Sequence, residues 1–83
     1  MTPLTVSVRL SGPLAATLGP RRSVGMPEGA TVTDLLQELV REARLETKDA
    51  ASLAATAGGS FLSRTHALAD GDELSVLVPV SGG

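Results

Sequence analysis

The clearest helical pattern in this chain is TVTDLLQELVREAR, residues 31–44. Its apolar side chains recur at spacings of three and four residues, which places them on one stripe of a helix. The members of this stripe are Val32, Leu35, Leu36, Leu39, Val40 and Ala43. Thr31 is positioned to cap the amino end, and Asp34 supplies the carboxylate of a capping box. The pattern predicts one main helix whose apolar stripe, centred on Leu36 and Leu39, packs against a sheet.

Strand-like segments lie on both sides of this helix. Residues 4–10 alternate apolar and polar side chains, which is typical of a half-buried strand. Gly58-Gly59 between two short segments indicates a hairpin turn. In chain order we expect a strand at 4–10, a helical turn at 14–18, a strand at 22–26, the helix at 31–44, short strands at 53–57 and 60–62, and a strand at 73–80.

The last strand is expected to be central in the sheet. Its run Val76-Leu77-Val78 lacks clear alternation, which is typical of a strand covered on more than one side. The first strand is its natural neighbour and would run parallel to it, because the connection between them is long and contains the helix. The predicted fold is α+β: a mixed sheet of four to five strands with one main helix on one face. We expect a domain at 1–80 and a flexible tail at 81–83.

Composition excludes several classes of protein. The chain has 83 residues, 42% of them hydrophobic and 19% charged, which fits one small globular domain. No apolar run approaches the roughly 20 residues of a membrane helix, and the start of the chain lacks the pattern of a signal peptide. We therefore expect a cytoplasmic protein with no membrane partner.

Nucleic acid is not an expected partner either. The net charge is −2 and Phe61 is the only aromatic residue, so there is neither a basic stripe for phosphates nor a platform for stacked bases. Cysteine is absent, which removes disulfides, thiolate metal sites and cysteine nucleophiles.

The remaining polar candidates favour structural interpretations. His66 is the only histidine and has no acid, cysteine or serine partner in a motif, so we expect an exposed loop residue. Asp70, Asp72 and Glu73 are too few for a calcium loop, and a tight turn around Gly71 explains them better. No serine-hydrolase elbow is present. The sequence predicts no metal site and no free-standing enzyme.

The end of the chain, Val80-Ser81-Gly82-Gly83, carries the strongest functional signal. Two glycines can pass through a slot too narrow for side chains, and four extended residues span at most roughly 13 Å. Such a tail can deliver its carboxylate into a partner's active site. The alternative is an ordinary disordered terminus.

Four segments together resemble one known family: PEGATV at 27–32, DLL at 34–36, LADGDEL at 68–74 and PVSGG at 79–83. With the order of elements, they resemble the ubiquitin-like sulfur carriers of the MoaD/ThiS family, most closely the small subunit of molybdopterin synthase. The resemblance implies a ubiquitin-like β-grasp fold. The chain departs from the family pattern at Ser11, where an aromatic residue is common, at Val78-Pro79 in place of Pro-Pro, and at Gly58-Gly59 in place of Asn-Gly.

The resemblance implies that a ubiquitin-activating-type adenylyltransferase adenylates Gly83 with ATP, after which a sulfur donor converts it to a thiocarboxylate. The acceptor would be an enzyme such as the large subunit of molybdopterin synthase. No cofactor is expected on this chain, because ATP and any zinc belong to the activating partner. The free protein is expected to be a monomer.

Two kinds of alternative stay open. The carrier could serve thiamine, cysteine or methionine, or a thio-containing specialised metabolite instead of molybdopterin. The same activated Gly83 could instead form isopeptide bonds with lysines, which would make the chain a protein modifier.

A tail inserted into a partner also needs a docking surface around its base, because a stable contact buries on the order of 800 Å² on each side. We expect an apolar patch of Phe61, Leu62 and one of Leu77 or Val78, together with the tail residues Pro79, Val80, Ser81 and Gly82. The alternative for Phe61 is a place in the core.

Overall fold

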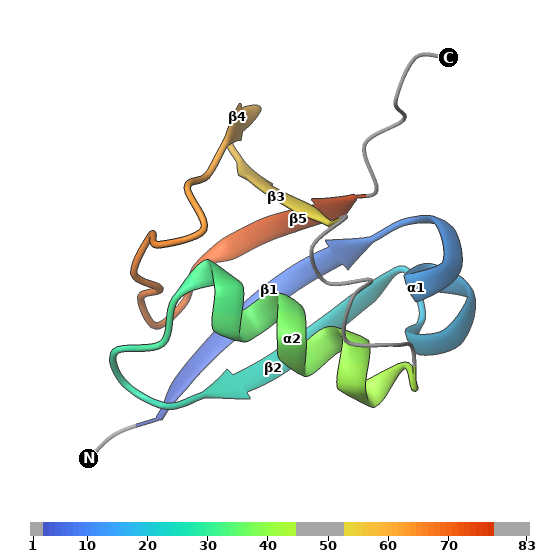
Figure 1. Cartoon of the computed structure of the whole chain (residues 1–83), viewed down its shortest axis with the longest axis horizontal. Helices are drawn as coiled ribbons and strands as arrows, with labels where there is room; N and C mark the ends of the chain where they lie inside the picture. The colour runs from blue at the N-terminus through green and yellow to red at the C-terminus, as the bar shows by residue number, and fades with distance from the viewer. Residues whose placement is uncertain (1–2, 45–52, 78–83) are drawn as a thin grey trace.

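The computed structural model describes residues 3–44 and 53–77 of the chain. Within these residues the chain forms five strands and two helices (Figure 1). In order they are β1 (Leu4–Leu10), α1 (Gly12–Leu18), β2 (Arg21–Met26), α2 (Val32–Glu42), β3 (Ala54–Ala57), β4 (Ser60–Phe61) and β5 (Glu73–Leu77). Each predicted element is present, with its ends moved by at most two residues within the described chain.

The strands form one mixed sheet in the order β2-β1-β5-β3-β4. β1 and β5 run parallel, with Val8 opposite Leu74, and the other neighbouring strands run antiparallel. A parallel pair needs a long crossover. Here the crossover includes α2, which lies across one face of the sheet (Figure 1). This confirms the predicted β-grasp arrangement of a mixed sheet with a main helix on one face.

β5 is the central strand, as predicted, but the described part of it is not buried on both faces. Leu74 and Val76 are buried, whereas Glu73 is exposed and Ser75 is half-buried. Pairing with β1 on one side and β3 on the other makes the strand central. The predicted continuation at 78–80 and the tail at 81–83 lie outside the described residues.

α2 begins with the predicted capping box. The Thr31 hydroxyl accepts a hydrogen bond from the Asp34 N–H at 3.4 Å, and the Asp34 carboxylate accepts one from the Thr31 N–H at 2.9 Å. The first turn of a helix has N–H groups with no partner inside the helix. The capping box provides an acceptor for the Asp34 N–H and also binds the N–H of Thr31, the residue before the helix. The helix ends at Glu42, and Arg44 has φ of 60°, which a right-handed helix does not allow.

The core lies between α2 and the inner face of the sheet. Leu35 and Leu39 are fully buried and Leu36 is 1% exposed, which confirms the predicted helix stripe. The sheet supplies Val6, Val8, Leu10, Val24, Met26, Ala55, Leu74 and Val76. Among the described residues no polar or charged side chain is buried in this core, so its stability comes from apolar burial.

The predicted hairpin turn joins β3 and β4. Gly58 and Gly59 have φ values of 59° and 85°, and positive φ at both positions is what a two-residue turn of this kind requires. Thr56 pairs with Phe61 and Ala57 with Ser60 across the hairpin. The turn therefore sets the register that places Phe61 opposite Thr56.

The acidic turn ties β5 to the start of β1. The Asp70 carboxylate accepts a hydrogen bond from the Thr5 N–H at 2.8 Å, and the Asp72 carboxylate accepts one from the Ala69 N–H at 2.8 Å. These groups are used within the fold, which confirms the tight-turn interpretation. His66 is exposed in the preceding loop, as expected.

Two searches of the described residues bear on function. Residues 3–44 and 53–77 contain no cluster of three or more His, Cys, Asp or Glu side chains that could hold a metal ion. Neither α1 nor α2 is long and apolar enough to cross a membrane.

Candidate functional site

The predicted reactive tail begins where the described part of β5 stops. Gly83, and the partner-binding residues predicted before it, lie outside the described residues; these are Gly82, Ser81, Val80 and Pro79, with Val78 as one option in the docking patch. Gly83 is six residues beyond Leu77, so an extended chain between them spans at most about 20 Å. Any surface that docks a partner for Gly83 should therefore lie near the end of β5.

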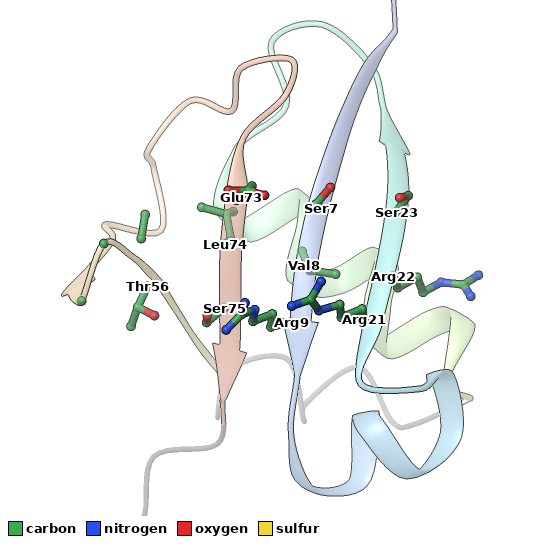
Figure 2. A pocket seen from close by; sticks show the side chains of 13 residues that line it. Ser7, Val8, Arg9, Arg21, Arg22, Ser23, Thr56, Glu73, Leu74 and Ser75 are labelled. Atoms are coloured by element: carbon green, nitrogen blue, oxygen red, sulfur yellow. The ribbon is translucent and has the colours of Figure 1, made fainter.

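The sheet face that points away from α2 lies next to that end, and we call it the outer face. It holds a shallow, open depression of about 530 Å³ (Figure 2). By strand alternation and pairing, the outer face consists of Thr5, Ser7, Arg9, Arg21, Ser23, Gly25, Ala54, Thr56, Phe61, Glu73, Ser75 and Leu77. Hydroxyl groups and charges predominate over most of it.

Phe61 projects from the outer end of this sheet. Its side chain is 70% exposed, and it is the only large apolar residue so exposed in the described part of the chain. This exposure excludes the alternative that Phe61 fills the core. An exposed aromatic side chain is a typical interface anchor, and the docking role of Phe61 stays a prediction.

The other two described members of the predicted patch differ in position. Leu77 is half-buried on the outer face, where it pairs with Ala54. Leu62 is half-buried and packs against the core, and its N–H donates to the Ala55 carbonyl at 2.9 Å. The structure therefore brings Phe61 and Leu77 to one face and turns Leu62 toward the other, while their binding roles stay predictions.

Two arginines on the outer face were not predicted as site residues. Arg9 lies directly opposite Arg21 on β2, and on its other side it pairs with Ser75 on β5. Ser75 pairs with Thr56, which pairs with Phe61. Alternation within residues 4–10 places Arg9 outward, but no sequence pattern tells which residue of β2 lies beside it.

The arginines elsewhere in the fold include two with acidic partners. The Arg22 Nε lies 2.7 Å from a Glu42 carboxylate oxygen, and Arg41 pairs with Glu38. In each pair the hydrogen bond first, and the opposite charge second, raises the pKa of the arginine. Arg9 and Arg21 have no ion pair with any described acid.

Most of the chain matches the model of one protein family. Residues 8–83 match the model of the ThiS family. The chain belongs to the ThiS family. The comparison of this ThiS-family protein with curated proteins finds no match.

Several solved structures are similar over nearly the whole length. SAMP1 of Haloferax volcanii is 30% identical, with a TM-score of 0.71 over 95% of this chain and 99% of that chain. Small archaeal modifier protein 1 of H. volcanii is 27% identical, with a TM-score of 0.73 over 93% of this chain and 99% of that chain. A putative molybdopterin converting factor, subunit 1, of Pyrococcus furiosus is 25% identical, with a TM-score of 0.75 over 93% of this chain and 99% of that chain. These similarities confirm the predicted MoaD/ThiS resemblance.

Another solved structure supports the fold alone. The ubiquitin of Caldiarchaeum subterraneum is 17% identical, with a TM-score of 0.68 over 99% of this chain and 100% of that chain. The ThiS-family protein therefore has a ubiquitin-like β-grasp fold, as the sequence predicted.

Proposed function

We propose that this ThiS-family protein is a sulfur carrier that works through the C-terminal carboxylate of Gly83. The observation that supports this most directly is the family match, which spans residues 8–83 and so includes the Gly82-Gly83 pair. For the pathway, we propose that the carrier is the small subunit of a molybdopterin synthase, on the strength of its similarity to the Pyrococcus furiosus converting-factor subunit. Thiamine, sulfur amino acids and thio-containing specialised metabolites are the other branches.

The proposed chemistry has two steps. A Gly83 carboxylate oxygen attacks the α-phosphorus of ATP and pyrophosphate leaves, which turns a poor electrophile into an acyl-adenylate. A sulfide equivalent from the sulfur donor then attacks the acyl carbon, and AMP leaves with the bonding electron pair. The product is a thiocarboxylate at Gly83. ATP, any zinc and the catalytic groups belong to the activating partner in this proposal, and the acceptor is the large subunit.

The fold supports this role by holding the start of the tail on its central strand. β5 is hydrogen-bonded to β1 on one side and to β3 on the other, and its side chains Leu74 and Val76 are buried in the core. A strand paired on both edges has little freedom to move. Leu77 is therefore a firm base from which the last residues reach a partner.

The test is to append one alanine after Gly83. Incubation with the ubiquitin-activating-type enzyme of the same organism, ATP and sulfide should give the unchanged chain the added mass of one sulfur replacing one oxygen. The extended chain should gain no mass, because its carboxylate is displaced from the active site. Equal thermal melting of the two chains is the control for folding, and equal thiocarboxylate formation would overturn the proposal.

Similarity to a modifier protein favours a second candidate, conjugation to lysines. The Haloferax volcanii structure at 27% identity is named small archaeal modifier protein 1. If this chain acts the same way, the Gly83 acyl group joins a lysine amine and AMP is released.

The sequence gives this candidate a clear signature. Lys48 is the only lysine, and no lysine or arginine follows Arg64, so trypsin would leave residues 65–83 attached to each modified lysine. Mass spectrometry of cells expressing the chain with Lys48→Arg, which has no lysine of its own, should find this remnant on other proteins. Its absence alongside thiocarboxylate would reject the modifier and retain the carrier.

A further inference from the structure

The opposed arginines on the outer face are an unfavourable feature of the sheet. Arg9 and Arg21 face each other directly across the antiparallel pair β1 and β2, and both residues are exposed. Figure 2 shows the two side chains lying over the same side of the sheet, with Arg9 extending toward Ser75. Like charges directly opposite one another destabilise a sheet, so this pair does not help the chain to fold.

No described acid forms an ion pair with Arg9 or Arg21. Among the described residues of the outer face Glu73 is the only acidic one, and it pairs with Ser7, one row away from Arg9. The ion pairs of the described residues join Arg22 to Glu42 and Arg41 to Glu38. Both guanidinium groups are therefore available to an outside group.

The two arginines form one end of a straight row across the sheet. In register the row is Arg21, Arg9, Ser75, Thr56 and Phe61, one residue from each of the five strands. Four strand spacings of about 4.8 Å give it a width of about 19 Å. One end is cationic, the middle is hydroxylic, and the other end is the exposed aromatic ring. We call it the cross-sheet row.

The cross-sheet row lies next to the base of the tail. Leu77 is two residues beyond Ser75 on β5, a distance of about 7 Å along a strand. A stable protein contact buries on the order of 800 Å² on each partner, more than the last four residues, Val80-Ser81-Gly82-Gly83, could provide. An enzyme that takes up Gly83 must therefore also contact the sheet around Leu77.

We propose that the cross-sheet row docks an acidic surface of the enzyme that activates Gly83. Carboxylates of that enzyme pair with Arg9 and Arg21, and an apolar hollow receives Phe61. The guanidinium group matches a carboxylate with two parallel hydrogen bonds, and a width of about 19 Å suits a protein surface rather than a small anion. The inference rests on the proposed function, since it takes the activating enzyme as the occupant.

The experiment measures ATP–pyrophosphate exchange by the purified ubiquitin-activating-type enzyme of the same organism, with the full chain as the varied substrate. Arg9→Glu and Arg21→Glu should each raise KM about tenfold and leave kcat unchanged. Phe61→Ala should also raise KM. The matched control is Arg44→Glu, which makes the same charge change at an exposed residue beyond the end of α2 and should leave KM nearly unchanged.

Stability provides a readout that separates docking from folding. Arg21→Glu places a carboxylate directly opposite Arg9, so its melting temperature should equal or exceed that of the unchanged chain. A variant that melts no lower yet docks less well has lost a contact with the enzyme. Raising the salt concentration should increase KM for the unchanged chain and affect the two charge-reversed chains less.

The outcomes distinguish this inference from the proposed function. Exchange with equal KM for Arg9→Glu, Arg21→Glu and Arg44→Glu overturns the docking row and leaves the carrier function standing. If the unchanged chain supports no exchange, direct calorimetric binding to the same enzyme decides. If Arg9→Glu and Arg21→Glu weaken that binding, the docking role of the cross-sheet row is supported and the carrier function is rejected. If the unchanged chain does not bind, both proposals are overturned.

Discussion

On β1, Val6, Val8 and Leu10 are buried beneath α2, whereas the residues that alternate with them, Thr5, Ser7 and Arg9, are exposed on the outer face. The same strand therefore carries two sets of side chains under different constraints. The inner set must be apolar because it fills a close-packed core. The outer set is free of that requirement. An unfavourable feature such as the Arg9 and Arg21 pair is tolerated there, because it disturbs no core packing.

The largest difference between the faces should come from shortening a core side chain. Leu39→Ala, and likewise Leu36→Ala, should lower the free energy of unfolding by about 2–5 kcal/mol, because both residues are buried among the helix and sheet. Urea titration measures the loss. The matched outer-face change Ser75→Ala should stay within about 0.5 kcal/mol. Equal effects on the two faces would contradict the assigned helix stripe.

Exchanging valine and threonine, which have nearly the same shape, should have opposite effects on the two faces of β1. Val6→Thr places a hydroxyl at a position that is fully buried and should cost about 1–3 kcal/mol. The reverse swap on the outer face, Thr5→Val, should leave stability unchanged or slightly higher, since valine suits a strand. Thermal melting of both variants measures the direction of each change in stability. If Val6→Thr melted at the temperature of the unchanged chain, the inner face of β1 would not be shielded from water.

Replacing two exposed glycines by alanine should have opposite effects on stability, because their backbone conformations differ. Gly71 has φ of 87°, so Gly71→Ala should cost about 1–2 kcal/mol in strain, even though no atom within 4 Å would meet the new methyl group. Gly25 lies on the outer face without a positive φ and also has open space around it. Gly25→Ala should therefore stabilise the protein by about 0.4–1 kcal/mol. Denaturation midpoints of the two variants should move in opposite directions.

The smallest effect should come from breaking the ion pair at the sheet edge. Glu42→Gln removes the acidic partner of Arg22, and both side chains are partly exposed, so the change in melting temperature should be barely measurable and smaller still in high salt.

Titration of Arg22 should add no pH dependence near neutrality. Glu42 raises the pKa of Arg22, so the contribution of this arginine is fully present below its ordinary pKa and is lost only as the pH rises through the raised value. The melting difference between the unchanged chain and Glu42→Gln should therefore show no loss of the Arg22 contribution between about pH 6 and pH 9. A loss of stability difference between the two chains within that pH range would contradict this expectation.

Much of the fold followed from local patterns. The spacing of Leu36 and Leu39 predicted the buried stripe of α2, the pair Thr31 and Asp34 predicted its cap, and Gly58-Gly59 predicted the hairpin. Each of these signals depends on residues within a few positions of one another. The ends of the elements were less certain, as in α2, where the helix ends at Glu42 and Arg44 takes a left-handed conformation.

Some features of the candidate site were also predicted from the sequence, and others depend on the tertiary structure. The reactive end at Gly82-Gly83 is a prediction made from the sequence alone, because the glycine pair and the family resemblance can be read without a structure. It left open whether Phe61 lies inside or outside, and it did not show Arg9 beside Arg21. Those facts depend on which strands pair and in what register. Pairing joins residues far apart in the chain, and their contacts exist only once the core has brought the strands together.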